Sequence, residues 1–223
     1  MNWRDHIEQW TNALKPYLDA EGVQCEIRGP ATEDEIDDLE EELCFEIPEC
    51  LRTFMEDESA YINFWWYLKS DISPINVSGD MPYCGYIEFG PQSIITLNSD
   101  RTGFLSDDLP NIYRRQWKQA FRILGVGNGD DIALDTFQNP DEPPVIYLNH
   151  EEPEKQVRLA DSFQEFIDTW FALGCVGPEG SNIRHFVTDK DKPLPEFENG
   201  SATSKLDITC PNAIAFRSFF GLK

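Results

Sequence analysis

Basic side chains are scarce in this sequence. Its 223 residues carry 18 lysines and arginines against 41 aspartates and glutamates, which gives a formal net charge of -23. A surface of that sign repels phosphate backbones and anionic lipid headgroups, so neither nucleic acid nor a membrane is an expected partner. The same charge attracts a basic protein and raises the rate of encounter with it. Solubility alone is the other interpretation of this acidity.

Long apolar runs are also missing. The longest one, Phe64 to Leu68, falls far short of the roughly twenty residues that a membrane span needs. The first residues, M-N-W-R-D-H-I, are polar and amphipathic and no apolar run follows them, so they do not read as a signal peptide. We therefore expect a cytoplasmic protein.

The sequence lacks the spacings that metal and catalytic sites require. Its six cysteines include no Cys-x-x-Cys pair and its three histidines are scattered, so we predict no metal and no cofactor. A Walker loop, a Gly-x-Gly-x-x-Gly turn and a Gly-x-Ser-x-Gly elbow are absent, which removes the commonest nucleotide-binding and hydrolase interpretations. Among 41 acidic residues no catalytic pair stands out. We predict that the protein is not an enzyme.

A short acidic segment and one histidine were candidates for a local site. Asp130, Asp131 and Asp135 lack the Asp-x-Asp-x-Asp-Gly spacing and the closing glutamate of a calcium loop, so a turn followed by a strand is the better interpretation. His150 ends a predicted strand beside Glu151, which favours a hydrogen-bonded structural histidine over a catalytic base.

Apolar periodicity predicts helices on both sides of a strand-rich region. Thr32 and Glu35 form a capping box at the start of one helix, and aromatic and β-branched runs broken by turn residues begin at Tyr61. The predicted helices run from Trp3 to about Pro16, from Thr32 to Leu43, from Pro48 to Met55, from Asn111 to Ala120, and from a cap at Asp161 to Gly174. The predicted strands are Tyr61–Leu68, Cys84–Phe89, Ser93–Leu97, Phe121–Val126, Asp131–Phe137 and Pro144–Asn149.

This order of elements predicts an α+β fold. We expect N-terminal helices, a central, mostly antiparallel sheet of about six strands, and a C-terminal helix packed on that sheet. Residues 1–30 are predicted to form a helical N-terminal extension and residues 31–177 the main domain. Residues 178–223, which are rich in turn residues, are predicted to be a C-terminal extension packed on the same domain.

Four segments in sequence order carry a family resemblance. Ala31–Phe54 joins a glutamate-rich helix, an Ile-Pro pair and an aromatic helix, and Gly129–Asp135, Pro144–Glu151 and Ala160–Asp168 follow it. Together they resemble the SUKH superfamily over about residues 31–175. That superfamily includes immunity proteins against bacterial polymorphic toxins and regulators of cell-wall synthesis. The resemblance implies binding rather than catalysis, with a cognate protein toxin such as a nuclease, or another basic protein, as the partner.

The acidic helix is the first candidate for binding that partner. Asp34, Asp37, Asp38 and Glu41 lie on its polar side, where carboxylates would steer a basic toxin and set the register of the complex. A solvated helix face is the alternative interpretation.

The aromatic run is the second candidate, through Trp65, Trp66 and Tyr67. Alternation along a strand sends either Phe64 and Trp66 or Trp65 and Tyr67 outward, and exposed aromatic residues are typical interface anchors. Core packing is the alternative for at least half of them. Two other functions stay open beside toxin neutralisation, namely a scaffold or regulator of cell-wall synthesis and a hydrolase of a glycan or peptide.

Overall fold

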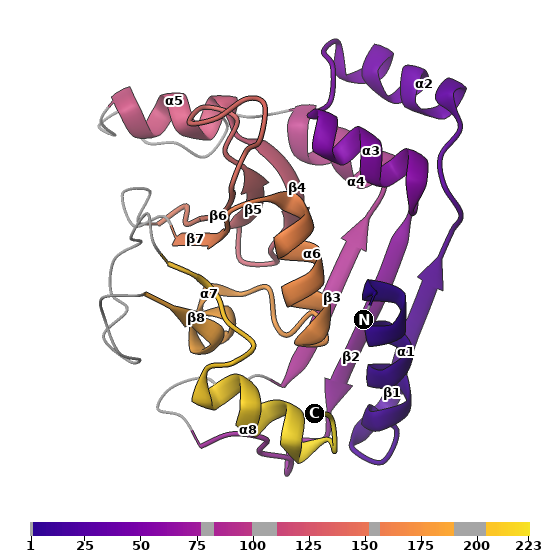
Figure 1. Ribbon diagram of the computed structural model, residues 1–223, viewed down its shortest axis with the longest axis vertical. Coiled ribbons are helices and arrows are strands. Elements are labelled where there is room, and N and C mark those ends of the chain that lie inside the picture. The colour runs from indigo at the N-terminus through magenta and orange to yellow at the C-terminus, as the bar shows by residue number, and fades with distance from the viewer. Residues whose placement is uncertain (1, 77–82, 100–110, 152–156, 190–203) are drawn as a thin grey trace.

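The computed structural model describes residues 2–76, 83–99, 111–151, 157–189 and 204–223 (Figure 1). The elements follow one another as α1 (Trp3–Leu14), β1 (Leu18–Ile27), α2 (Glu33–Leu43), α3 (Glu49–Asp57), β2 (Ile62–Leu68), β3 (Cys84–Phe89), α4 (Pro91–Ser99), α5 (Asn111–Gln119), β4 (Phe121–Gly125), β5 (Asp131–Leu134), β6 (Val145–Leu148), β7 (Val157–Ala160), α6 (Phe163–Ala172), α7 (Gly180–Ile183), the 3-10 helix η1 (Arg184–Phe186), β8 (Val187–Thr188), β9 (Lys205–Leu206) and α8 (Pro211–Phe219). The predicted α+β class is confirmed. Within the described residues no helix combines the length and the apolar character that crossing a bilayer requires.

Strands β1, β2 and β3 form an antiparallel sheet in that order, with β2 in the middle. Residues 18–27 were expected in a helical extension and instead form β1. A shift of register between Leu18 and Val23, next to Gly22 at φ 78°, hides the strand's alternation from a sequence pattern. Beyond that shift, Val23, Cys25 and Ile27 pair with the inward-facing residues of β2.

The strands do not make one central sheet. Strands β4 to β7 form a second antiparallel sheet in sequence order, and β8 pairs with β9. Helices α4 and α5 separate β3 from β4 along the chain, and the two larger sheets share a single hydrophobic core instead of a ladder of hydrogen bonds. The predicted sheet of about six strands is therefore divided between two sheets.

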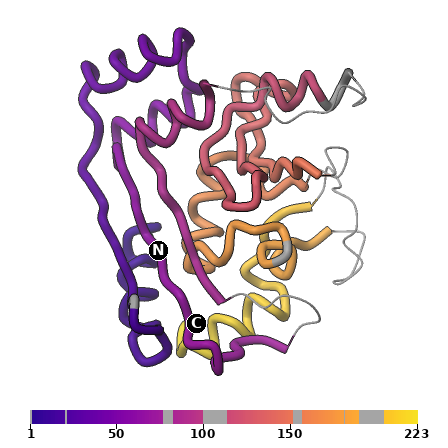
Figure 2. The backbone as a smooth tube through the Cα atoms, turned by 180° about the vertical axis from the view of Figure 1, so that it is seen from behind, coloured from indigo at the N-terminus to yellow at the C-terminus, as the bar shows by residue number. Residues whose placement is uncertain are grey.

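One face of the first sheet is covered by helices. In Figure 1, α1 and α6 lie in front of the long strands, whereas Figure 2 shows these strands from behind, with none of the described helices in front of them. The Trp10 ring of α1 stacks on Trp66 of β2 with centroids 6.4 Å apart, and Phe216 of α8 packs on Trp10 at 5.4 Å. Both terminal helices thus bury aromatic surface on the same core, while the domain boundaries at residues 30 and 177 stay a prediction.

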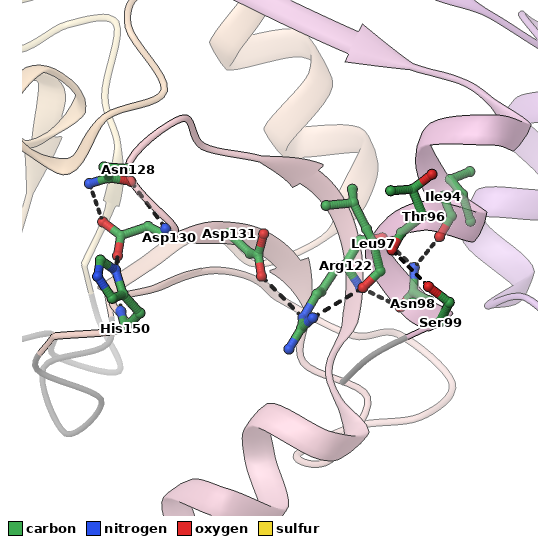
Figure 3. Close-up of polar contacts among 10 residues, drawn as sticks. All are labelled: Ile94, Thr96, Leu97, Asn98, Ser99, Arg122, Asn128, Asp130, Asp131 and His150. Atoms are coloured by element: carbon green, nitrogen blue, oxygen red, sulfur yellow. Dashed lines mark hydrogen bonds and ion pairs between the residues drawn. The ribbon is translucent and has the colours of Figure 1, made fainter. Parts of the chain in front are cut away.

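Helix α4 replaces the strand predicted at Ser93–Leu97. Its β-branched residues, Ile94 to Thr96, are typical of a strand, but the hydrogen bonds of Asn98 hold this segment as a helix against β4 (Figure 3). The buried amide of Asn98 donates to Ile94 O and Arg122 O at 2.9 Å, and its oxygen accepts from Arg122 N at 3.0 Å. Tertiary hydrogen bonding thus overrides local propensity.

The cap of α6 is Ser162 rather than the predicted Asp161. The Ser162 hydroxyl accepts from Glu165 N at 3.2 Å, which satisfies an otherwise unpaired amide of the first turn. Asp161 instead pairs with Arg158 at 2.9 Å and with Lys205 at 3.1 Å. It therefore joins the helix start to β7 and β9.

Candidate partner-binding surface

Helix α2 presents the predicted acidic residues to solvent. Eight of its eleven residues are carboxylates, and only Ile36, Leu39 and Leu43 are buried. The helix begins at a capping box in which Thr32 Oγ1 accepts from Glu35 N at 3.3 Å and Thr32 N donates to Glu35 Oε2 at 2.8 Å. The bond from Thr32 N, and a second one that the Thr32 hydroxyl donates to the same carboxylate oxygen, lower the pKa of Glu35. The capping box predicted from the sequence is confirmed.

The four predicted contact residues of α2 point away from the core. Asp34, Asp37, Asp38 and Glu41 are all exposed, and their side chains make no hydrogen bond or ion pair within the described part of the chain. Glu40, by contrast, pairs with Arg52 of α3 at 2.5 Å and accepts from Ile47 N at 2.8 Å. Figure 1 shows α2 at the end of the strands that is remote from α8. We call Asp34, Asp37, Asp38 and Glu41 the acidic face.

The structure of β2 shows which of its alternating aromatic residues face outward. Phe64 and Trp66 are fully buried, whereas Tyr67 is 37% exposed and Trp65 is half-buried. The Trp66 indole donates to Gly174 O at 2.8 Å inside the core. Trp66 was predicted to contact the partner, and this was wrong because its whole surface is used in packing.

Trp65 and Tyr67 belong to a larger polar and aromatic surface on the uncovered side of the first sheet. Trp65 lies between Gln24 of β1 and Tyr86 of β3, and its indole donates to Gln24 Oε1 at 3.0 Å. Tyr67 contacts Trp65 at 5.8 Å and Tyr83 at 6.5 Å between ring centroids. The remaining outward positions hold two acids, an asparagine and a cysteine. We call the following set the sheet face: the strand residues Gln24, Glu26, Asn63, Trp65, Tyr67, Cys84 (buried), Tyr86 and Glu88, together with Tyr83, which precedes β3 and whose ring contacts Tyr67.

A cleft of about 420 Å³ joins the acidic face to the sheet face. Its α2 wall includes Glu35, Asp38 and Glu42, its opposite wall is the start of α4, and Glu88 closes it at the sheet. Glu88 also accepts a hydrogen bond of 2.8 Å from the Tyr86 hydroxyl. Its carboxylate therefore belongs both to the cleft and to the sheet face. Burial and this bond raise the pKa of Tyr86, which keeps the phenol protonated as a donor.

Arg28 is the basic residue that lines the cleft. Its guanidinium carbon lies 4.6 Å from the centroid of the Tyr61 ring, and its Nε lies 3.3 Å from Glu26 Oε1. Gly90 makes room for that ring, since a Cβ at this position would come within 2.6 Å of Tyr61 Cδ2. No sequence pattern singles out Arg28, Tyr61, Tyr86 and Glu88, because strand pairing and not sequence proximity brings them together.

Asp130 organises a separate hydrogen-bond network at the second sheet (Figure 3). It accepts from the Tyr147 hydroxyl at 2.6 Å, from Asn128 Nδ2 at 2.8 Å and from His150 N at 2.9 Å, and His150 Nδ1 lies 2.7 Å away. Tyr147 in turn accepts from Gly180 N at 2.7 Å. The hydrogen-bonded histidine predicted at position 150 is confirmed. Asp131 and Asp135 face other partners, Arg122 at 3.1 Å and Gln116 at 2.7 Å.

We predict that Asp130→Asn lowers stability at neutral pH by about 2 kcal/mol, because an amide group would face donors that now meet a carboxylate. Burial alone would raise the pKa of Asp130, but its hydrogen bonds with Tyr147, His150 and Asn128 together lower it from the ordinary 3.8. The carboxylate therefore stabilises the fold fully at pH values above the ordinary pKa of 3.8, and this contribution is lost as the pH falls through the lower pKa of the folded state. Urea unfolding of both proteins should show a difference that shrinks in acid. A constant difference at every pH would contradict this assignment.

One comparison with known proteins gives a family. Residues 30–169 match the family model described as SMI1 / KNR4 family (SUKH-1), which is more than half of the chain. The matched span begins just before α2 and ends inside α6, so it contains the acidic face and both β2 and β3. No curated protein matches the chain.

Proposed function

The chain belongs to the SMI1 / KNR4 family (SUKH-1), and on that premise we propose that it is an immunity protein that neutralises a basic toxin in the cytoplasm. It acts by direct contact and not by catalysis, with the acidic face and the sheet face as its binding surface. A nuclease is a fitting toxin class, because a protein that binds phosphate backbones carries positive charge where this surface is negative.

The carboxylates of the acidic face, which have no ion-pair partner among the described residues, are the observation that carries this proposal. Asp34 and Asp38 are four residues apart on the helix, as are Asp37 and Glu41, and each such like-charge pair costs about 0.2 to 0.5 kcal/mol. Interspersed lysines would have served solubility without that cost. A concentration of one sign of charge on one face instead favours the steering of an oppositely charged partner.

The adjoining aromatic residues supply what charge alone does not. Exposed carboxylates raise the association rate but add little affinity, whereas tyrosine and tryptophan side chains at the centre of an interface often contribute most of the binding energy. Trp65 and Tyr67 lie on a strand, so their positions are held by the ladder of β1, β2 and β3. A rigid aromatic surface beside a steering helix suits tight binding of one protein.

Co-expression tests the proposal. Where a neighbouring gene encodes a secreted protein with a variable C-terminal domain, that domain is the candidate toxin, and it is induced in a bacterial host while growth is measured. We expect the wild-type chain to restore growth, and the variant Asp34→Lys/Asp37→Lys/Glu41→Lys to restore it poorly. The matched control is Asp141→Lys/Glu142→Lys/Glu151→Lys, which changes the net charge equally at exposed positions outside the surface.

Two results would contradict the proposal. Failure of the wild-type chain to form a complex with that domain would remove its role as the cognate immunity protein. Copurification with several proteins of cell-wall synthesis, and with no toxin, would instead favour the regulator function that the same family match supports.

A further inference from the structure

We propose that the sheet face selects arginine side chains of the partner, with guanidinium groups stacked on Trp65, Tyr67 and Tyr86 and held at Glu88. This inference rests on the proposed function and names the chemistry of the partner segment that the surface accepts. It concerns the uncovered side of β1, β2 and β3, and not the acidic face of α2.

The composition of the sheet face favours a cationic occupant. Its outward strand positions hold three aromatic residues and two carboxylates and no basic residue. Glu88 uses Oε2 to accept from Tyr86, while its Oε1 makes no bond within the described residues. The second oxygen is therefore available beside Tyr86, on the wall of the cleft.

The protein itself contains one example of the contact that we propose. Arg28 follows β1 on this side of the sheet, where Arg28 N donates to Tyr61 O at 2.9 Å. Its guanidinium lies over the Tyr61 ring at 4.6 Å and against Glu26 at 3.3 Å, although the side chain is 66% exposed. An aromatic ring and a carboxylate thus hold a guanidinium at one end of the face. Trp65, Tyr86 and Glu88 repeat that combination farther along it, and no lysine or arginine of the described residues contacts them.

Arginine fits this arrangement better than lysine does. A guanidinium is planar, stacks flat on an aromatic ring while its edge donates to a carboxylate, and loses its water more easily than an ammonium group. Each stacked guanidinium at an exposed site strengthens binding by about two- to fivefold. The long-range attraction of the acidic face, by contrast, acts equally on both residue types because it depends only on charge.

Two synthetic peptides test the inference, an arginine-glycine repeat and the same repeat with lysine, each with blocked ends. Trp65 is a natural reporter, because the other five tryptophans are at most 3% exposed and acrylamide quenches an accessible indole. We expect the arginine peptide to protect this fluorescence and to bind at least about fivefold more tightly in calorimetry than the lysine peptide. The Asp34→Lys/Asp37→Lys/Glu41→Lys variant should weaken both peptides alike.

The variant Trp65→Leu separates stacking from charge. It keeps an apolar side chain but removes the ring, so the preference for arginine should fall while the lysine peptide binds as before. Tyr67→Leu is a second variant with the same expected direction, and thermal unfolding of each checks that the fold is retained.

The outcomes distinguish this inference from the proposed function. Equal binding of the two peptides, or binding of neither to a chain that neutralises its toxin, would overturn the arginine preference and leave the immunity function in place. A preference for arginine that Trp65→Leu abolishes would support the inference, even where co-expression shows no neutralisation.

Discussion

Replacing Gly85 by alanine is expected to lower the free energy of unfolding by about 3 kcal/mol, as the sum of overpacking and a lost buried hydrogen bond. Gly85 lies on β3 directly opposite Trp66, and an added Cβ would overlap the Trp66 indole and the carbonyl oxygen of Gly174. Those two groups share the hydrogen bond of 2.8 Å that fixes Trp66 in the core. Neither can move easily, since one is backbone and the other stacks on Trp10.

The same position joins the C-terminal end of α6 to the sheet. Gly85 forms a bridge with Val176, Tyr86 N donates to Cys175 O at 2.9 Å, and Gly177 N donates to Cys84 O at 2.7 Å. Alanine at position 85 would therefore disturb both the core and this junction. Any loss of partner binding should then follow the unfolded fraction of the protein.

Urea unfolding measures this effect, with Gly127→Ala as the matched control. A Cβ at Gly127 would meet no atom within 4 Å, so we expect its stability to stay within about 0.5 kcal/mol of wild type. An equal stability of the Gly85→Ala and Gly127→Ala proteins would show that the strand can shift to accept the methyl group, contrary to the packing described.

Local patterns in the sequence were sufficient for most helices. The capping box at Thr32 and Glu35 and the spacing of Ile36, Leu39 and Leu43 define α2, because each signal depends on neighbours within one or two turns. Alternation in β2 reduced the aromatic run to two outcomes but could not choose between them. That choice depends on which side α1 covers, and only the tertiary structure supplies it.

The features that could not be predicted depend on contacts between distant segments. Strand β1 is interrupted by a register shift, and α4 carries a β-branched sequence whose helix is fixed by Asn98 against β4. The acidic cleft combines residues from α2, β3 and α4, which no local pattern connects. The carboxylates of α2 were identifiable from the sequence, whereas the residues that flank Trp65 in the sheet, Gln24 and Tyr86, were not.

Reversing Asp34, Asp37 and Glu41 to lysine is expected to slow association with the toxin domain by roughly ten- to a hundredfold at low salt, because steering by the acidic face is lost. Dissociation should change little, since these side chains are exposed and make no close contacts within the described chain. The variant should stay folded, because all three positions are exposed and lysine at 34 and 37 faces acids at 38 and 40, while lysines at 37 and 41 repel each other no more than Asp37 and Glu41 do.

Salt dependence identifies the cause of that change. Stopped-flow association at about 20 mM and about 500 mM salt should show a steep decrease for the wild-type chain, since screening shortens the reach of its field, and a shallow one for the variant. The Asp141→Lys/Glu142→Lys/Glu151→Lys control carries the same net charge, so it should keep most of the wild-type rate if the position of the charges matters. Equal rates for all three proteins would place the partner on another surface, and equal slowing of both variants would mean that net charge alone guides the encounter.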